Sequence, residues 1–183
     1  MLEWLFLGMV IFFILLFVFI YNNLISLRAR IDNAWAQIDV QLKKRYDLVP
    51  NLVETVKGYA KHEKEIFENV TKARTAALSA TSVKEKAKAD SEFSAALKSI
   101  FAIAENYPQL RASENFKLLQ EQLDGIESKI AYARQFYNDA VLEYNTKIAQ
   151  IPYSIIASLF AFTPRDYFNI EEKERQNIKV SFT

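Results

Sequence analysis

The chain has 183 residues, and its 23 Lys and Arg residues are almost balanced by 22 Asp and Glu residues. Proteins that bind nucleic acid usually carry a clear basic excess, so we expect no nucleic-acid partner. The absence of Cys excludes disulfides, thiolate nucleophiles and Cys-based metal sites. Three Gly and four Pro residues are too few for a typical all-β or α/β protein, and we therefore expect an all-α fold.

An uncharged apolar segment lies near the start of the chain, from Trp4 to Tyr21. As a helix it spans roughly 27 Å, close to the hydrocarbon thickness of a bilayer. We expect a membrane anchor within residues 1–23, with Trp4, Phe12, Phe13 and Tyr21 as anchoring side chains. A core helix is the alternative, but a helix apolar on every face needs a larger protein around it. A cleaved signal peptide needs a basic start and small residues at the cleavage site, and the sequence has neither.

The flanking charges predict the orientation of this anchor. Arg28 and Arg30 follow the apolar segment closely, whereas no Lys or Arg precedes it. The positive-inside rule places the basic flank in the cytoplasm. We therefore expect an N-terminus outside, followed by a short stub, and the bulk of the chain in the cytoplasm.

Beyond the anchor, apolar residues recur every three or four positions, which predicts amphipathic helices. We expect four of them, at about 24–60, 63–80, 84–106 and 113–151. Pro50 falls within the first range, but the apolar spacing continues through it, so we expect a kink near Asp47–Pro50 rather than an end. Short connections between four helices predict an antiparallel four-helix bundle over residues 24–152, elongated because its first and last helices are long.

An even number of helices returns the chain to the membrane end, so residues 153–168 are expected to form a short apolar membrane-proximal segment. Three interpretations of its apolar part, 153–162, remain open: packing against the end of the bundle, entry into the lipid interface, or contact with another subunit. The candidate interface residues are Ile155, Ile156, Leu159, Phe160 and Phe162. Residues 169–183 are expected to be a mobile tail, with 178–182 as a strand-like docking piece.

The sequence offers little for catalysis. His62 is followed by Glu63, but Ile66 stands where a zinc motif requires its second His. A single His cannot complete a di-iron site either. We expect a solvated or capping His62, with a pH switch as the alternative. We predict no catalytic residue, no metal site and no cofactor.

Two further patterns invite an interpretation. Tyr137-Asn138 recurs as Tyr144-Asn145 one heptad later, and the tyrosine hydroxyls need partners if they are buried. We expect polar contacts that fix the register inside the bundle, with a partner-facing ladder as the alternative. The basic run Lys43-Lys44-Arg45 is expected to be solvated or paired with acids on a neighbouring helix.

Several longer strings resemble the LemA family. They include Asn-Ala-Trp-x-Gln-Ile-Asp-Val-Gln-Leu-Lys at 33–43, Arg-Tyr-Asp-Leu-Val-Pro-Asn-Leu-Val at 45–53, Thr-Val-Lys-Gly-Tyr-Ala-x-His-Glu at 55–63, Ala-Glu-x-Tyr-Pro-x-Leu at 104–110, Ala-x-Ala-Arg-x-x-Tyr-Asn at 131–138 and Val-x-Phe at 180–182. The similarity covers about 21–182. Residues 79–89 and 171–177 depart from the pattern of the family.

The resemblance implies one span of the bacterial inner membrane, a cytoplasmic helical bundle and no catalytic residues. It also implies links with membrane metalloproteases of the HtpX type, with envelope maintenance and with the organisation of internal membranes. We therefore expect a membrane-anchored scaffold or adaptor that associates with itself or with envelope proteins. The alternative is an oligomeric membrane-shaping protein whose segment 153–162 enters the lipid interface.

Overall fold

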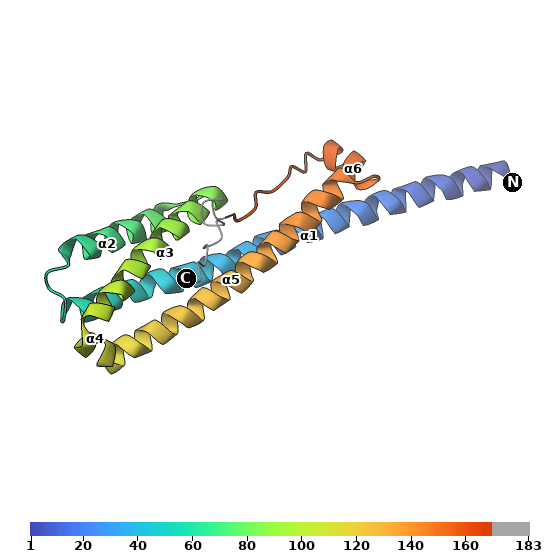
Figure 1. The fold of residues 1–183 in the computed structure, drawn as a ribbon. Coiled ribbons are helices and arrows are strands. Elements are labelled where there is room, and N and C mark those ends of the chain that lie inside the picture. The colour runs from blue at the N-terminus through green and yellow to red at the C-terminus, as the bar shows by residue number, and fades with distance from the viewer. Residues whose placement is uncertain (170–183) are drawn as a thin grey trace, which may run out of the picture. The chain divides into compact units, whose positions relative to one another are not determined.

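The structure, a computed structural model, describes residues 1–169 (Figure 1). Its regular elements are all helices: α1 (Leu2–Lys57), α2 (Lys64–Ser79), α3 (Val83–Asn106), α4 (Pro108–Ala112), α5 (Glu114–Ala149) and α6 (Tyr153–Leu159). The all-α prediction is therefore confirmed over this range. The short helix α4 was not predicted. The tail expected at 169–183, apart from Asn169, and its docking piece at 178–182 lie outside the described residues.

The anchor and the helix expected at 24–60 form one continuous helix, α1, which also passes through Pro50. A proline at this position has no N–H to donate to the carbonyl of Tyr46, four residues earlier. The structure supplies another donor, because Nε of Arg74 in α2 lies 2.7 Å from that oxygen. Pro50 itself is exposed, so its ring meets no core side chain. Arg74 thus replaces the hydrogen bond that proline removes.

A capping box that our sequence analysis overlooked begins α3. The Ser82 hydroxyl accepts a hydrogen bond from the Glu85 main chain at 3.2 Å, and the Glu85 carboxylate accepts one from the Ser82 main chain at 3.1 Å. Together with the donors of Thr81, these bonds lower the pKa of Glu85. The spacing Ser-x-x-Glu is the sequence signature of such a start.

The chain divides into two compact units, and each is described by itself. Unit 1 contains Met1–Ile38 and Ala133–Tyr167, so it holds the first part of α1, the last part of α5, and α6. Its core is formed by Leu24 and Ile31 of α1 with Val141 and Tyr144 of α5, all at most 2% exposed. The rings of Trp35 and Tyr137 lie 5.5 Å apart at the edge of this core.

In unit 1, three side chains of α5 hold the extended segment that follows α6. The Tyr137 hydroxyl donates to the carbonyl of Asp166 at 2.9 Å, and the Tyr144 hydroxyl donates to that of Thr163 at 3.2 Å. Asn145 makes two bonds with the main chain of Arg165: its Nδ2 donates to the carbonyl at 3.0 Å, and its Oδ1 accepts from the N–H at 2.9 Å. We call Tyr137, Tyr144 and Asn145 the clasp.

Burial keeps the two tyrosines of the clasp protonated. Burial raises the pKa of Tyr137 and of Tyr144, so both hydroxyls retain their protons. The guanidinium of Arg165, which lies 3.4 Å from Asp32, opposes part of this rise. The polar contacts of Tyr137, Tyr144 and Asn145 were expected to fix the register inside the bundle, but the hydrogen bonds of these side chains go elsewhere. The three side chains bind the main chain of the residues that follow α6.

Unit 2 contains Asp39–Tyr132 together with Phe168 and Asn169 of the described chain. Its core includes Tyr46 of α1 and Phe93 of α3, whose rings meet edge to face at 5.0 Å. The side chain of Arg45 is also buried there, and it pairs with Asp90 of α3 and Glu127 of α5 and donates to Ser94 at 3.2 Å. Of the basic run, Lys43 and Lys44 are exposed and only Arg45 is paired with acids. One buried cation thereby connects three helices.

We expect the replacement of Arg74 by Met to lower the free energy of unfolding by about 1–3 kcal/mol, because the Tyr46 carbonyl loses its donor. In a Pro50→Ala background the N–H of residue 50 restores the helical hydrogen bond, so the cost of Arg74→Met is expected to fall to about 0.5 kcal/mol. Urea unfolding of the four proteins of this double-mutant cycle in detergent measures the coupling. The exposed Lys72→Met on the same helix is the control, and equal costs of Arg74→Met in both backgrounds contradict the assignment.

Loss of the clasp should release the segment after α6. Asn145→Ala removes both hydrogen bonds to Arg165, so we expect trypsin to cleave the native chain after Arg165 on the order of tenfold faster. Mass spectrometry of the fragments during limited proteolysis follows this cleavage. Tyr132→Phe, at an exposed position of the same helix, should leave the rate unchanged. An unchanged rate in Asn145→Ala shows that Asn145 does not hold the segment.

Stability should fall at alkaline pH because of Tyr46. Burial, reinforced by the Asp90 carboxylate, raises the pKa of Tyr46 from 10.0 to about 12. The unfolded chain then loses this proton before the folded chain does, so stability falls as the pH rises from 10 to about 12, by up to about 2 kcal/mol. We expect Tyr46→Phe to remove this part of the fall in the free energy of unfolding, which urea unfolding measures at each pH. If the free energy of unfolding falls equally with pH in both proteins, the raised pKa of Tyr46 is not the cause.

Candidate functional site

The apolar part of α1 has almost no protein cover. It is long and apolar enough to cross a membrane, and only 6% of its most apolar 18-residue stretch is buried. The expected anchoring residues Trp4, Phe12 and Phe13 are exposed, while Tyr21 is half-buried. A core helix would be covered by other elements, so this exposure favours a membrane span over the core alternative.

The two arginines that follow the span occupy different surroundings. Arg30 pairs with Glu143 of α5 at 2.8 Å and lies over the ring of Phe136 at 5.3 Å. Arg28 is exposed. The surroundings of Arg28 and Arg30 do not test the orientation that the positive-inside rule predicts. That orientation stays a prediction.

The candidate interface residues of segment 153–162 divide into two groups. Ile156 is buried, and Phe160 and Phe162 contact Tyr21 with ring separations of 4.9 and 6.0 Å. Phe160 also lies 5.8 Å from Phe17, within the apolar span. Ile155 and Leu159, in contrast, are exposed. The residues directly after α6 thus pack against α1, whereas Ile155 and Leu159 of α6 itself are left uncovered.

The turn after α6 directs the two phenylalanines. The N–H of Phe162 donates to the carbonyl of Ala157 at 2.9 Å, while Ala161 between the two rings has a φ of 53°. This left-handed conformation usually requires glycine and costs an alanine about 1 kcal/mol. The strained residue lies between two side chains that both reach Tyr21.

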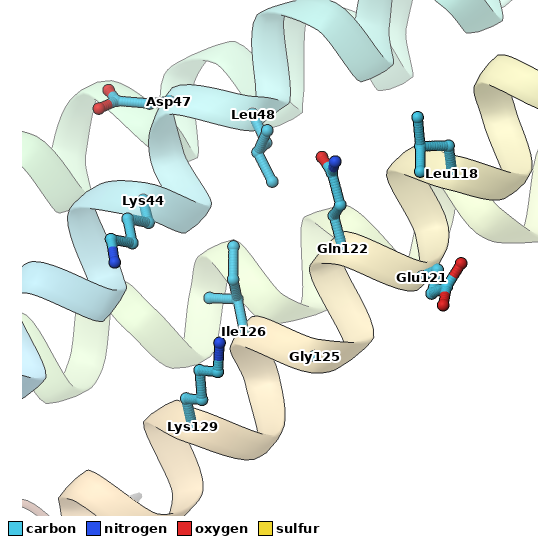
Figure 2. A pocket seen from close by; sticks show the side chains of 9 residues that line it. All are labelled: Lys44, Asp47, Leu48, Leu118, Glu121, Gln122, Gly125, Ile126 and Lys129. Atoms are coloured by element: carbon cyan, nitrogen blue, oxygen red, sulfur yellow. The ribbon is translucent and has the colours of Figure 1, made fainter.

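Unit 2 carries an open groove between α1 and α5, with a volume of about 650 Å³ (Figure 2). Its lining is mixed: Leu48, Leu118 and Ile126 are apolar, Lys44, Asp47, Glu121 and Lys129 carry charge, and Gln122 and Gly125 complete it. Figure 2 shows Leu48 and Ile126 directed into the space between the helices and Glu121 directed away from it. The groove therefore has an apolar floor and charges of both signs at its rim.

Gly125 contributes to the width of this groove. It lies inside α5, where glycine costs about 0.5–1 kcal/mol relative to alanine, and no turn requires it. A Cβ added at this position would meet no atom within 4 Å, so the space beside it is open. Sequence analysis missed the groove, and the isolated glycine within a helical pattern was the one available signal.

The remaining sequence candidate for chemistry, His62, is exposed in the turn between α1 and α2. Among residues 1–169, no three or more His, Cys, Asp or Glu side chains come together in a way that could hold a metal ion. What the described residues offer chemically is apolar contact at α6 and mixed apolar and ionic contact in the groove. Both are suited to association.

Comparison with known proteins identifies a family and three relatives. The model of the LemA family matches residues 34–182. The chain is 24% identical over 174 residues to magnetosome proteins MamQ 1 and MamQ 2 of Paramagnetospirillum magneticum, and 23% identical over 175 residues to magnetosome protein MamQ of Magnetospirillum gryphiswaldense. Each match covers 81% of this chain and 64% of the relative, so the chain spans less than two thirds of their length.

The family match includes the Pro50 region of α1, all of α2 to α6 and the clasp. It covers far more than half of the chain, and it agrees with the resemblance found in the sequence strings. This chain is a member of the LemA family.

Proposed function

We propose that the chain is a single-pass adaptor of the bacterial inner membrane, with its N-terminus outside and its bulk in the cytoplasm. In this proposal α1, α2, α3 and α5 form an antiparallel four-helix bundle that is non-catalytic and presents binding surfaces to other proteins. The contacts of Arg45 with α3 and α5, and of Arg74 with α1, support such a bundle. The uncovered apolar part of α1 supports the anchor.

The groove of unit 2 is the observation that carries the adaptor role. An amphipathic helix binds its partner by laying an apolar stripe into a hydrophobic groove, while charges at the edges fix its direction. Leu48, Leu118 and Ile126 supply the apolar floor for such a stripe. Lys44 and Lys129 lie on one stretch of the rim and can pair with acidic residues of the incoming helix.

Two classes of partner fit this groove. One is a second copy of the chain, which would make the protein an oligomer. The other is a helix of another envelope protein, such as the membrane metalloproteases that the family resemblance implies. The matches to magnetosome proteins support a role at a membrane without identifying the partner.

Membrane shaping is the second candidate function, favoured by the exposed Ile155 and Leu159 beside the span. It requires many copies side by side as well as contact with lipid. An adaptor, in contrast, requires only a defined complex. The number of copies joined by cross-linking in native membranes therefore separates the two candidates.

We expect a photo-reactive phenylalanine analogue at Leu118 to cross-link a defined partner in native membranes. Gly125→Trp fills the groove and should reduce this product at least about fivefold, because the partner helix can no longer enter. A product at twice the 21.2 kDa mass identifies a second copy, and mass spectrometry identifies any other partner. A ladder of many copies favours membrane shaping.

Gly125→Ala is the matched control for this experiment. Its methyl group leaves the groove open, and it should raise helix stability by about 0.5–1 kcal/mol while preserving the cross-linked product. Equal loss of product in the Ala and Trp variants contradicts docking in the groove. Recovery of the uncross-linked 21.2 kDa chain alone in every variant contradicts the adaptor role.

A further inference from the structure

We propose that the uncovered face of α6 inserts into the lipid interface, beside the point where α1 leaves the hydrocarbon. Ile155 and Leu159 form this face and are 65% and 71% exposed, and Ile151, in the turn before α6, is 83% exposed. Ile156 and Ala157 on the opposite face are buried. The helix thus has apolar side chains that protein covers and apolar side chains, Ile155 and Leu159, that protein leaves uncovered.

Contacts with the span fix the depth of α6. Trp4 to Tyr21 covers roughly the thickness of the hydrocarbon, which places Tyr21 at the level of the headgroups. The ring of Phe160 lies 4.9 Å from Tyr21 and 5.8 Å from Phe17. Phe17 is one helical turn, about 5 Å, deeper in the hydrocarbon than Tyr21. The C-terminal end of α6 therefore lies where acyl chains meet the headgroups.

The charge pattern of the segment fits this depth. No charged residue occurs between Lys147 and Arg165, so the whole of α6 can enter an apolar medium. The basic residue before the segment, Lys147, suits the phosphate level of the membrane. Lys147 extends over the ring of Tyr153 at 4.7 Å, as a lysine does when its stem is buried and its ammonium stays near water.

Lipid is a better occupant of this face than a second copy of the chain. Because Phe160, directly after α6, touches the span, the uncovered face of α6 adjoins the layer that surrounds α1 in a membrane. A second copy would have to displace that lipid first. The clasp holds the segment after α6 by its main chain, so α6 keeps this position without any subunit contact. The inference rests on the proposed membrane anchorage of α1.

Single-cysteine labelling tests the inference on the full chain, which has no cysteine of its own. A bimane fluorophore is attached to Leu159→Cys, and the protein is reconstituted in nanodiscs of phosphatidylethanolamine and phosphatidylglycerol. Quenching is measured with a lipid carrying a shallow doxyl group and, separately, with aqueous iodide. Phe19→Cys, exposed on the span, is the lipid reference.

Leu142→Cys is the matched aqueous control. It is an exposed apolar position of the same unit, next in sequence to Glu143, which pairs with Arg30. Arg30 follows Tyr21 by nine residues, so this level lies about 13 Å beyond the headgroup end of the span. We expect the doxyl lipid to quench the probe at Leu159 at least about threefold more than at Leu142, and iodide to show the reverse order.

Each other outcome overturns the inference in a distinguishable way. Iodide quenching at Leu159 equal to that at Leu142 shows that α6 faces water. Protection from both quenchers, with doubled mass on cross-linking, shows a second copy on this face. Loss of doxyl quenching at Phe19 as well shows that α1 does not span the bilayer, which removes the anchorage on which both this inference and the proposed function rest.

Discussion

Pro50 leaves the carbonyl of Tyr46 without the N–H donor that an uninterrupted helix supplies, and α1 continues through this position with a replacement donor. Arg74 of α2 supplies the donor to the carbonyl of Tyr46. The bond fixes α2 against the last turns of α1. The same stretch of α1 carries Lys44, Asp47 and Leu48, which form the α1 side of the groove. The replacement hydrogen bond therefore lies within the turns of α1 that line the groove, although α2 itself does not line it.

The helical spacing of apolar residues made most of the fold predictable. A stripe at every third or fourth position identifies a helix without knowledge of its neighbours. The helix expected at 84–106 does end at Asn106, since Tyr107, the residue before Pro108, avoids helical geometry. The span was predictable for a similar reason, since length and absence of charge are properties of the segment alone. These local signals required no knowledge of which elements meet.

The partners of polar side chains were not predictable, because they depend on how the chain returns on itself. The Tyr-Asn repeat indicated buried hydroxyls, but the acceptors lie in residues 163–166, which no periodicity connects to α5. Arg45 and Lys44 are adjacent basic residues on different faces of α1, and the surrounding helices bury Arg45 and leave Lys44 exposed. The groove was even less predictable from sequence, because a groove forms where the side chains of two neighbouring helices do not contact each other.

The proposed lipid contact of α6 needs little energy of its own. Three apolar side chains contribute about 1.5–3 kcal/mol each when removed from water, which is too weak to hold a free seven-residue helix at a membrane. The covalent connection to α5 and the contacts of Phe160 with α1 keep α6 beside the lipid, so its insertion is intramolecular and the effective concentration is high. A single span is free to tilt in the bilayer. A second lipid contact on one side of α1 restricts the tilt of unit 1 relative to the membrane.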